Sequence, residues 1–118
     1  MLKLEGINEN RVLSITASGK LTRHDYQQLI PEVENLLEKF GTLRFFIRAR
    51  EISGFEVRAM WEDIKFDARH ADQFGKTAIV GEKKWQEWGT ELASLFFDAP
   101  MKYFDHNEEK LAWTWVNT

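Results

Sequence analysis

The residue types that could carry chemistry are few and widely spaced along this chain. Its three histidines, His24, His70 and His106, stand too far apart to pair at helical spacing, and the chain has no cysteine. Disulfides, thiolate nucleophiles and cysteine-based zinc sites are therefore excluded. Glu62 and Asp63 are consecutive carboxylates that would point away from each other on a helix. A charged solvent face explains them better than acid–base catalysis does.

The chain also lacks the loops that position phosphates and nucleophiles. It contains no glycine-rich dinucleotide or P-loop motif and no nucleophile elbow. We therefore predict that the protein is not an enzyme and that it has no catalytic residues, no metal site and no cofactor.

One serine lies where negative charge would be favoured. Ser53, followed by Gly54 and Phe55, stands between a predicted strand and a predicted helix, where backbone N–H groups lack partners. A phosphate on Ser53 would be stabilised at that position, so Ser53 is a candidate phosphorylation site. The alternative is that Ser53 or Gly54 caps the helix and does nothing more.

The segment after Ser53 combines aromatic and basic side chains. On a helix, Phe66 lies about 180° from the apolar face, and Arg58, Lys65 and Arg69 fall within about 40° of one another. The competing explanation for this basic strip is a solvated helix face balanced by Glu62. The candidate ligand- or membrane-contact residues of this region are Phe55, Arg58, Met60, Trp61, Lys65, Phe66, Arg69 and Phe74.

Aromatic residues on neighbouring elements are expected to be accessible as well. Phe46 shares its side of a strand with three arginines, and Phe55 lies in a predicted loop. Single exposed aromatics are common and need no explanation. If Phe55, Phe66 and Phe74 gather, however, they form an apolar patch able to meet a membrane, a lipid or a partner.

Length and composition favour one soluble, folded domain over residues 1–118. The chain has 118 residues, 43% of them hydrophobic and 14% aromatic, and its formal net charge is −3. Nucleic-acid binding by bulk electrostatics is therefore not expected, because it needs an excess of Lys and Arg. No secretory signal and no apolar run of about 20 residues is present, so we expect a cytoplasmic protein whose only membrane contact would be peripheral.

Hydrophobic periodicity gives an alternating order of elements. Alternation or short apolar runs predict strands near 2–4, 12–18, 43–50, 77–80 and 101–104, and helical spacing predicts helices over 22–40, 57–71, 85–96 and 107–116. This order indicates an α/β fold class: a mainly parallel sheet of four to five strands, an N-terminal antiparallel hairpin and about four helices.

Local signals mark where the helices begin and end. Thr22 is the expected N-cap of the first long helix, with Asp25 as its capping-box partner, and Gly41 is the expected C-terminal cap. Pro31 predicts a kink in that helix at residues 27–31. Asn107 is the expected N-cap of the last helix.

These elements and motifs resemble the STAS fold, and within it the SpoIIAA-like family of small bacterial proteins. The resemblance rests on Gly19-Lys20-Leu21-Thr22 with Asp25-Tyr26, on Trp61-Glu62-Asp63-Ile64-Lys65-Phe66 with His70, on Val80-Gly81-Glu82-Lys83-Lys84-Trp85, and on Tyr103-Phe104 with Ala112-Trp113. It implies a sheet of four or five strands with helices, no cofactor and no known catalytic residues. Anti-sigma factor antagonists carry Asp-Ser-[Ser/Thr]-Gly before the second helix; here Ser53-Gly54-Phe55 matches, but the aspartate is missing.

Two functions follow, and both stay open. The leading hypothesis is a non-enzymatic module that binds an apolar ligand or lipid, or associates peripherally with a membrane, through the second helix region. This hypothesis draws on a fold-level similarity to lipid carriers of the CRAL-TRIO type. The alternative is a protein-binding regulator of the anti-sigma factor antagonist type, switched at Ser53, with a regulatory protein as its partner. An edge strand and the many aromatics also make a homodimer plausible.

Overall fold

The structure is a computed structural model that describes residues 1–55, 74–82 and 101–118. The elements in these ranges are β1 (Leu2–Ile7), β2 (Val12–Leu21), α1 (Arg23–Phe40), β3 (Leu43–Phe55), β4 (Phe74–Gly81), β5 (Met101–Asp105), the short 3₁₀ helix η3 (His106–Glu108) and α4 (Glu109–Asn117). The sequence predicted about four α-helices, whereas the described ranges hold two. The other two, predicted over 57–71 and 85–96, fall on residues outside the description.

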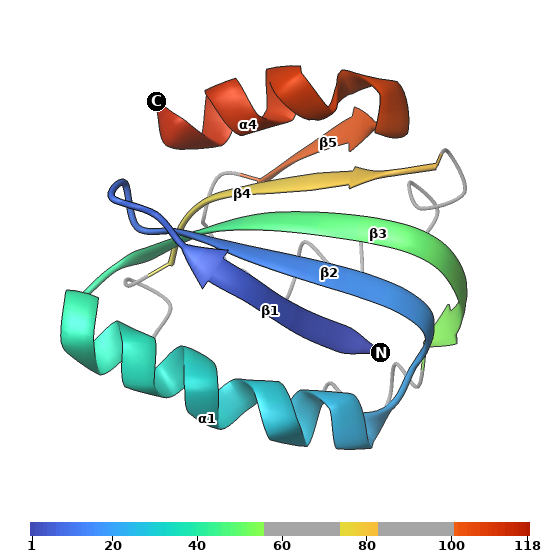
Figure 1. Ribbon diagram of the computed structural model, residues 1–118, viewed down its shortest axis with the longest axis horizontal. Coiled ribbons are helices and arrows are strands. Elements are labelled where there is room, and N and C mark those ends of the chain that lie inside the picture. The colour runs from blue at the N-terminus through green and yellow to red at the C-terminus, as the bar shows by residue number, and fades with distance from the viewer. Residues whose placement is uncertain (56–73, 83–100) are drawn as a thin grey trace.

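The strands form one mixed sheet in the order β1-β2-β3-β4-β5. β1 pairs antiparallel with β2, while β2 with β3, β3 with β4 and β4 with β5 are parallel. The strands therefore follow one another across the sheet, with the hairpin strand β1 at one edge (Figure 1). This arrangement confirms the predicted α/β class, the mainly parallel sheet and the antiparallel N-terminal hairpin.

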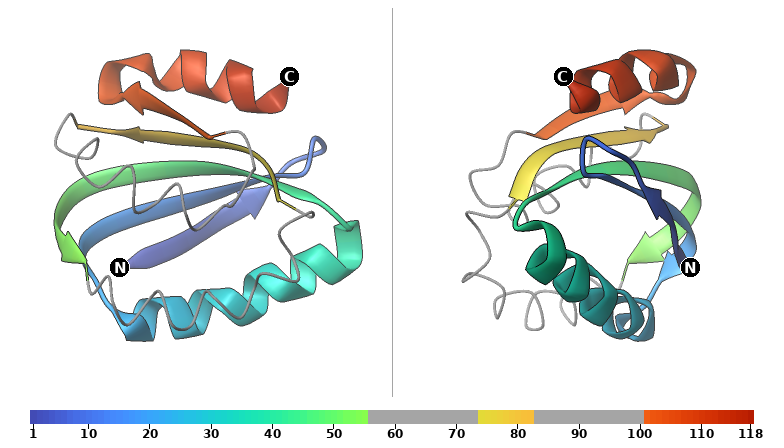
Figure 2. Two further views of the ribbon diagram at one scale, coloured as in Figure 1. Left: turned by 180° about the vertical axis from the view of Figure 1, so that it is seen from behind. Right: turned by 60° about the vertical axis from the view of Figure 1, so that its left-hand side comes forward.

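The helices α1 and α4 lie on opposite faces of the sheet, as both views in Figure 2 show. α1 covers one face, where the core residues are Leu13, Ile15, Leu37, Leu43 and Phe45. α4 covers the other face, where the core residues are Val12, Phe46, Ala78, Val80, Phe104, Ala112 and Val116. Successive residues of a strand point to opposite faces, so β3 contributes Phe45 to one core and Phe46 to the other.

The predicted caps of α1 are confirmed. The Thr22 hydroxyl accepts a hydrogen bond from the Asp25 backbone N–H at 3.3 Å, and the Asp25 carboxylate accepts one from the Thr22 N–H at 2.9 Å. At the other end, Gly41 has a φ of 84° and donates its N–H to the Leu37 carbonyl at 2.8 Å. Pro31 lies inside α1, which continues as one helix on both sides of it.

The predicted cap of the last helix is wrong. Asp105 occupies the N-cap position, two residues before Asn107, and its side chain accepts from the His106 N–H at 2.8 Å. Glu108 completes a capping box by accepting from the Asp105 N–H at 3.1 Å. A 3₁₀ turn of His106–Glu108 therefore precedes α4, and Asn107 lies inside that turn.

The turn between β1 and β2 ties one end of the sheet to both helices. Asn8 and Asn10 each donate a side-chain hydrogen bond to the Asn117 side chain near the end of α4, at 2.7 and 3.0 Å. Arg11 donates to the Phe40 carbonyl at the end of α1, at 2.7 Å. These hydrogen bonds lie at the end of the sheet where β2 and β3 begin. The opposite end, where the parallel strands finish, carries the candidate site.

Candidate functional site

Most of the candidate contact residues lie outside the described part of the chain. Arg58, Met60, Trp61, Lys65, Phe66 and Arg69 all fall within 56–73, so the predicted second helix is not described. Two of the set can be placed by their backbone. Phe55 is the last residue of β3 and Phe74 is the first residue of β4, where it pairs with Leu43 at the start of β3. The two aromatics therefore lie at opposite ends of these parallel strands and do not gather.

The expected surroundings of Ser53 and Phe55 are corrected by the structure. Both were predicted to lie in a loop before a helix, but β3 runs through Ser53 and ends at Phe55. Phe55 pairs with Leu21 of β2, and Gly54 pairs with Lys20. Ser53 is skipped by the pairing register, which shifts at this point. Ser53 is therefore a bulged strand residue. The sequence did not reveal this, because the hydrophobic alternation of β3 stops at residue 50.

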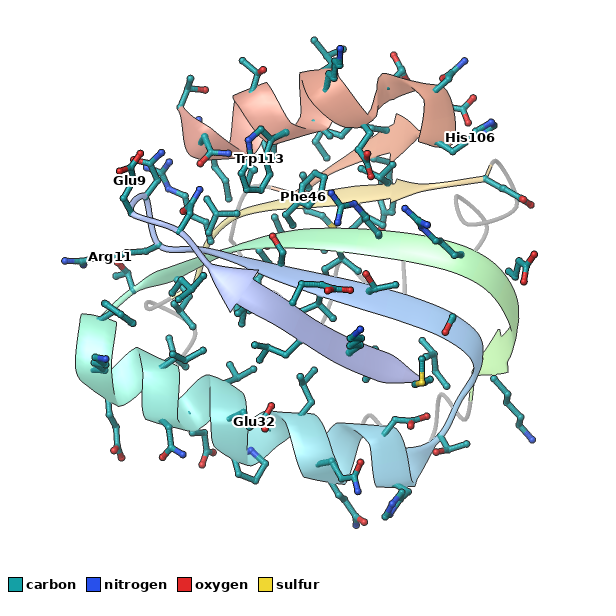
Figure 3. The ribbon with its side chains drawn as sticks, in the orientation of Figure 1. Glu9, Arg11, Glu32, Phe46, His106 and Trp113 are labelled. Carbon is teal, nitrogen blue, oxygen red and sulfur yellow. The ribbon has the colours of Figure 1, made fainter. Side chains whose placement is uncertain are left out.

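Phe46 was predicted to be an exposed aromatic residue, and this is also wrong. Its side chain is 0% exposed and belongs to the core beneath α4. The Trp113 ring of α4 packs against it with centroids 5.1 Å apart, as the side-chain view shows (Figure 3). The three arginines on the same side of β3 suggested a solvated face, but α4 covers that face, and Arg44 and Arg48 contact the helix.

The arginines of β3 hold both ends of α4. Arg44 donates to the Val116 carbonyl in the last turn at 3.0 Å. Arg48 donates through Nε to the carboxylate of Glu109 in the first turn, forming an ion pair. α4 therefore runs antiparallel to β3. Each pair agrees with the helix dipole, which favours a cation at the C-terminal end and an acidic side chain at the N-terminal end.

A pocket that sequence reasoning missed lies between β3, β4 and the first turn of α4. It has a volume of about 260 Å³ and is lined by Arg48, Ala49, Arg50, Val80, His106 and Glu109; we call it the Arg50 pocket. Val80 is next to last in β4 and His106 directly follows β5, so the pocket lies toward the carboxyl ends of these strands. Open α/β sheets commonly bind ligands in that position.

The charged groups of the Arg50 pocket differ in what they contact. Arg48 is held by Glu109, and its guanidinium also lies over the Phe46 ring, 5.1 Å from the centroid. Nδ1 of His106 is 2.9 Å from the Asp105 carboxylate, which orients the imidazole ring. Arg50 is exposed, and the structure gives it no hydrogen bond or ion pair with any residue of the described ranges.

Neither a group of metal-binding side chains nor a membrane-spanning helix is present among the described residues. Within 1–55, 74–82 and 101–118, no three His, Asp or Glu side chains are grouped so that they could hold a metal ion. Asp105 and Glu108, the acidic neighbours of His106, are engaged as helix caps instead. No helix in the same ranges is both long enough and apolar enough to cross a membrane.

The architecture defines a class of protein: a small α/β module whose parallel sheet begins with an antiparallel hairpin and ends with a C-terminal helix. The SpoIIAA-like family model matches residues 12–117. The chain belongs to the SpoIIAA-like family, which confirms the resemblance seen in the sequence.

A solved structure agrees with this assignment. A crystal structure of a protein from the DUF3478 family, with a SpoIIAA-like fold, from Shewanella loihica PV-4 is similar to this chain with a TM-score of 0.74. The two sequences are 30% identical, and the match covers 98% of this chain and 92% of the other. A search of the curated proteins found no match.

Proposed function

We propose that this protein is a non-enzymatic regulatory module that binds a lipid or an apolar small molecule through the segment from Phe55 to Phe74. In this proposal the protein is cytoplasmic and touches a membrane only at its surface. The SpoIIAA-like fold supports the regulatory part of the proposal. The lipid part comes from the composition of the segment, which contains Phe66 together with the basic residues Arg58, Lys65 and Arg69.

The observation that carries this proposal is the position of the two flanking aromatics. Phe55 ends β3, whereas Phe74 begins β4 beside Leu43, so these parallel neighbouring strands place the two aromatics at opposite ends of the sheet, where they bound the segment. The segment between them is therefore held at both ends by rigid elements. Sites that are supported by strands keep their geometry better than sites on free loops.

The expected strength of membrane contact follows from the charges. Each basic group near an anionic surface contributes on the order of 1 kcal/mol, so Arg58, Lys65 and Arg69 together give weak attraction. Apolar insertion must supply the rest, as it does for amphipathic helices at interfaces. Phe66 is the side chain that we assign to this insertion.

Native mass spectrometry of the freshly purified protein, followed by solvent extraction, tests the ligand part of the proposal. We expect a bound species whose extract contains a lipid or an apolar metabolite. A protein that carries no such ligand, and that also fails to take up added fatty acid or phospholipid, would contradict binding of an apolar molecule. The Leu111→Ala variant is a suitable control, because Leu111 is an apolar side chain outside the segment and is 58% exposed.

A second function is favoured by the bulge at Ser53. Bulges re-aim side chains near functional sites, and Ser53 is, with Glu51, one of the two β3 residues that the β2–β3 register skips. Ser53 would then regulate docking of a protein partner. Crosslinking in cell extract followed by identification of the captured proteins tests this alternative. We expect one partner to be lost with Ser53→Asp and kept with Ser53→Ala, and equal capture by both variants would remove the switch.

A further inference from the structure

Among the described residues, one arginine at a pocket has no side-chain partner. Arg50 lines the Arg50 pocket from β3, and its five N–H donors make no hydrogen bond to any described residue. Arg48 lies two residues earlier on the same face of the strand and uses Nε for Glu109. Its terminal Nη groups make no hydrogen bond within 1–55, 74–82 and 101–118. The Cα atoms of these two residues are about 7 Å apart along the strand, and their side chains leave it on one side of the sheet.

The acidic side chains near the pocket do not neutralise Arg50. Glu109 is paired with Arg48. Asp105 accepts from His106, and Glu108 accepts from the Asp105 backbone. Asp105 and Glu108 keep their charge but do not line the pocket, whose charged lining groups are Arg48, Arg50 and Glu109. The unmatched charge of the pocket is positive and is carried by Arg50.

From this arrangement we propose that the Arg50 pocket binds the phosphate of a small phosphate monoester, with Arg50 as its principal donor. A planar carboxylate is satisfied by one guanidinium fork, whereas the tetrahedral oxygens of a phosphate accept from two forks at once. Arg48 and Arg50 offer two. Val80 pairs with Arg48 in the sheet and supplies an apolar wall for the carbon part of the ligand.

The ligand class is limited by the size of the pocket. About 260 Å³ is smaller than most drug-sized ligand sites, so the pocket suits a head group or a short phosphorylated metabolite. The phosphate could belong to a free metabolite or to a lipid head group. The inference goes beyond the proposed function, because it concerns residues 48–50, 80, 106 and 109 and would hold even if the segment from Phe55 to Phe74 bound nothing.

Titration of the full chain with glycerol 3-phosphate, followed by ¹H–¹⁵N NMR, tests the proposal. We expect saturable shifts of the Arg50 Nε–Hε signal and of the backbone amides of Arg48, Arg50 and His106. Loss of a charge-assisted hydrogen bond weakens binding about tenfold or more, so Arg50→Ala should raise the dissociation constant by at least that factor. Arg50→Lys should give a smaller loss, because lysine keeps the charge but not the fork.

The matched control is Lys110→Ala, which removes one positive charge from α4 at an exposed residue that does not line the pocket. It should change the dissociation constant by less than about twofold, since an exposed charge outside the pocket contributes little. Equal losses in Arg50→Ala and Lys110→Ala would overturn the proposal. So would shifts that sodium chloride of the same ionic strength reproduces.

Vesicles distinguish the two sources of phosphate. Phosphatidylcholine vesicles with and without phosphatidic acid are added to the complex with glycerol 3-phosphate. Reversal of the pocket shifts by phosphatidic acid alone supports a lipid head group, and persistence of the shifts supports a soluble metabolite. Absence of binding to either probe overturns the phosphate site but leaves the apolar contact of Phe66 to be judged by its own test.

Discussion

The rings of Phe46 and Trp113 pack edge to face, with centroids 5.1 Å apart and planes 81° apart. Phe46 is fully buried, while Trp113 stays 38% exposed at the border of α4. This pair joins the middle of β3 to the C-terminal helix. It therefore fixes the helix beside which the Arg50 pocket is formed.

We predict that Phe46→Ala will lower the free energy of unfolding by about 3 to 5 kcal/mol, because it leaves a cavity beneath α4. Urea denaturation followed by tryptophan fluorescence measures this change. Leu111→Ala, on the exposed side of the same helix, should change it by no more than about 0.5 kcal/mol. A loss below about 1 kcal/mol for Phe46→Ala would mean that α4 does not cover this face.

The ion pair between Arg48 and Glu109 should be weak and sensitive to salt. Their side chains are 33% and 41% exposed, so solvent screens the attraction. A double-mutant cycle with Arg48→Met and Glu109→Gln should give a coupling energy of up to about 1 kcal/mol that falls as salt is added. Glu32→Gln, at an exposed position on α1, controls for the change of net charge. A coupling energy near zero at low salt would show that the pair does not stabilise α4.

Asp25 should make stability depend on pH in the acid range. Burial acts to raise the pKa of its carboxyl group, but hydrogen bonds from Thr22 and the N-terminal ammonium group outweigh burial and hold the pKa below its ordinary value. A carboxyl group whose pKa is lowered by folding stabilises the native state above the unfolded pKa. This stabilisation is lost as pH falls through the folded pKa.

The difference in unfolding free energy between wild type and Asp25→Asn should therefore be largest at neutral pH and shrink between about pH 5 and pH 3. Thermal unfolding at a series of pH values measures it. Thr22→Ala removes the cap itself and should cost about 1 kcal/mol. A difference that grows on acidification would contradict the lowered pKa.

Glu51 occupies the left-handed region, with a φ of 48°, where β3 first departs from regular pairing. A side chain costs about 1 to 2 kcal/mol in this conformation, and a β-branched one suffers most. Glu51→Gly should therefore leave stability unchanged or raise it by up to about 1 kcal/mol, whereas Glu51→Val should lower it. Since Glu51 is exposed, packing adds little to either effect. If both variants were equally stable, the bulge would not impose this conformation in solution.

Most features set by local sequence were predicted correctly, although Asp105 and not Asn107 caps the turn before the last helix. The capping box of Thr22 and Asp25 involves residues three apart, and Gly41 ends the helix by its own backbone freedom. The antiparallel hairpin follows from a short turn between β1 and β2, and the parallel pairing of β2 with β3 follows from the helical crossover between them.

Features that depend on distant segments were not predicted. The burial of Phe46 depends on α4, which lies more than sixty residues later in the chain. The pocket joins Arg48 and Arg50 to His106 and Glu109, which lie more than fifty residues later, and hydrophobic periodicity says nothing about which charged side chains meet. The bulge at Ser53 was missed because strand periodicity is lost where a strand carries an extra residue.

The central claim is that the segment between Phe55 and Phe74 contacts lipid through Phe66. Flotation with phosphatidylcholine vesicles that contain phosphatidic acid tests it most directly. We predict that wild type and Leu111→Ala will rise with the vesicles and that Phe66→Ala will remain largely in the bottom fraction. If wild type stays at the bottom, or if Phe66→Ala floats as well as Leu111→Ala, the claim is contradicted.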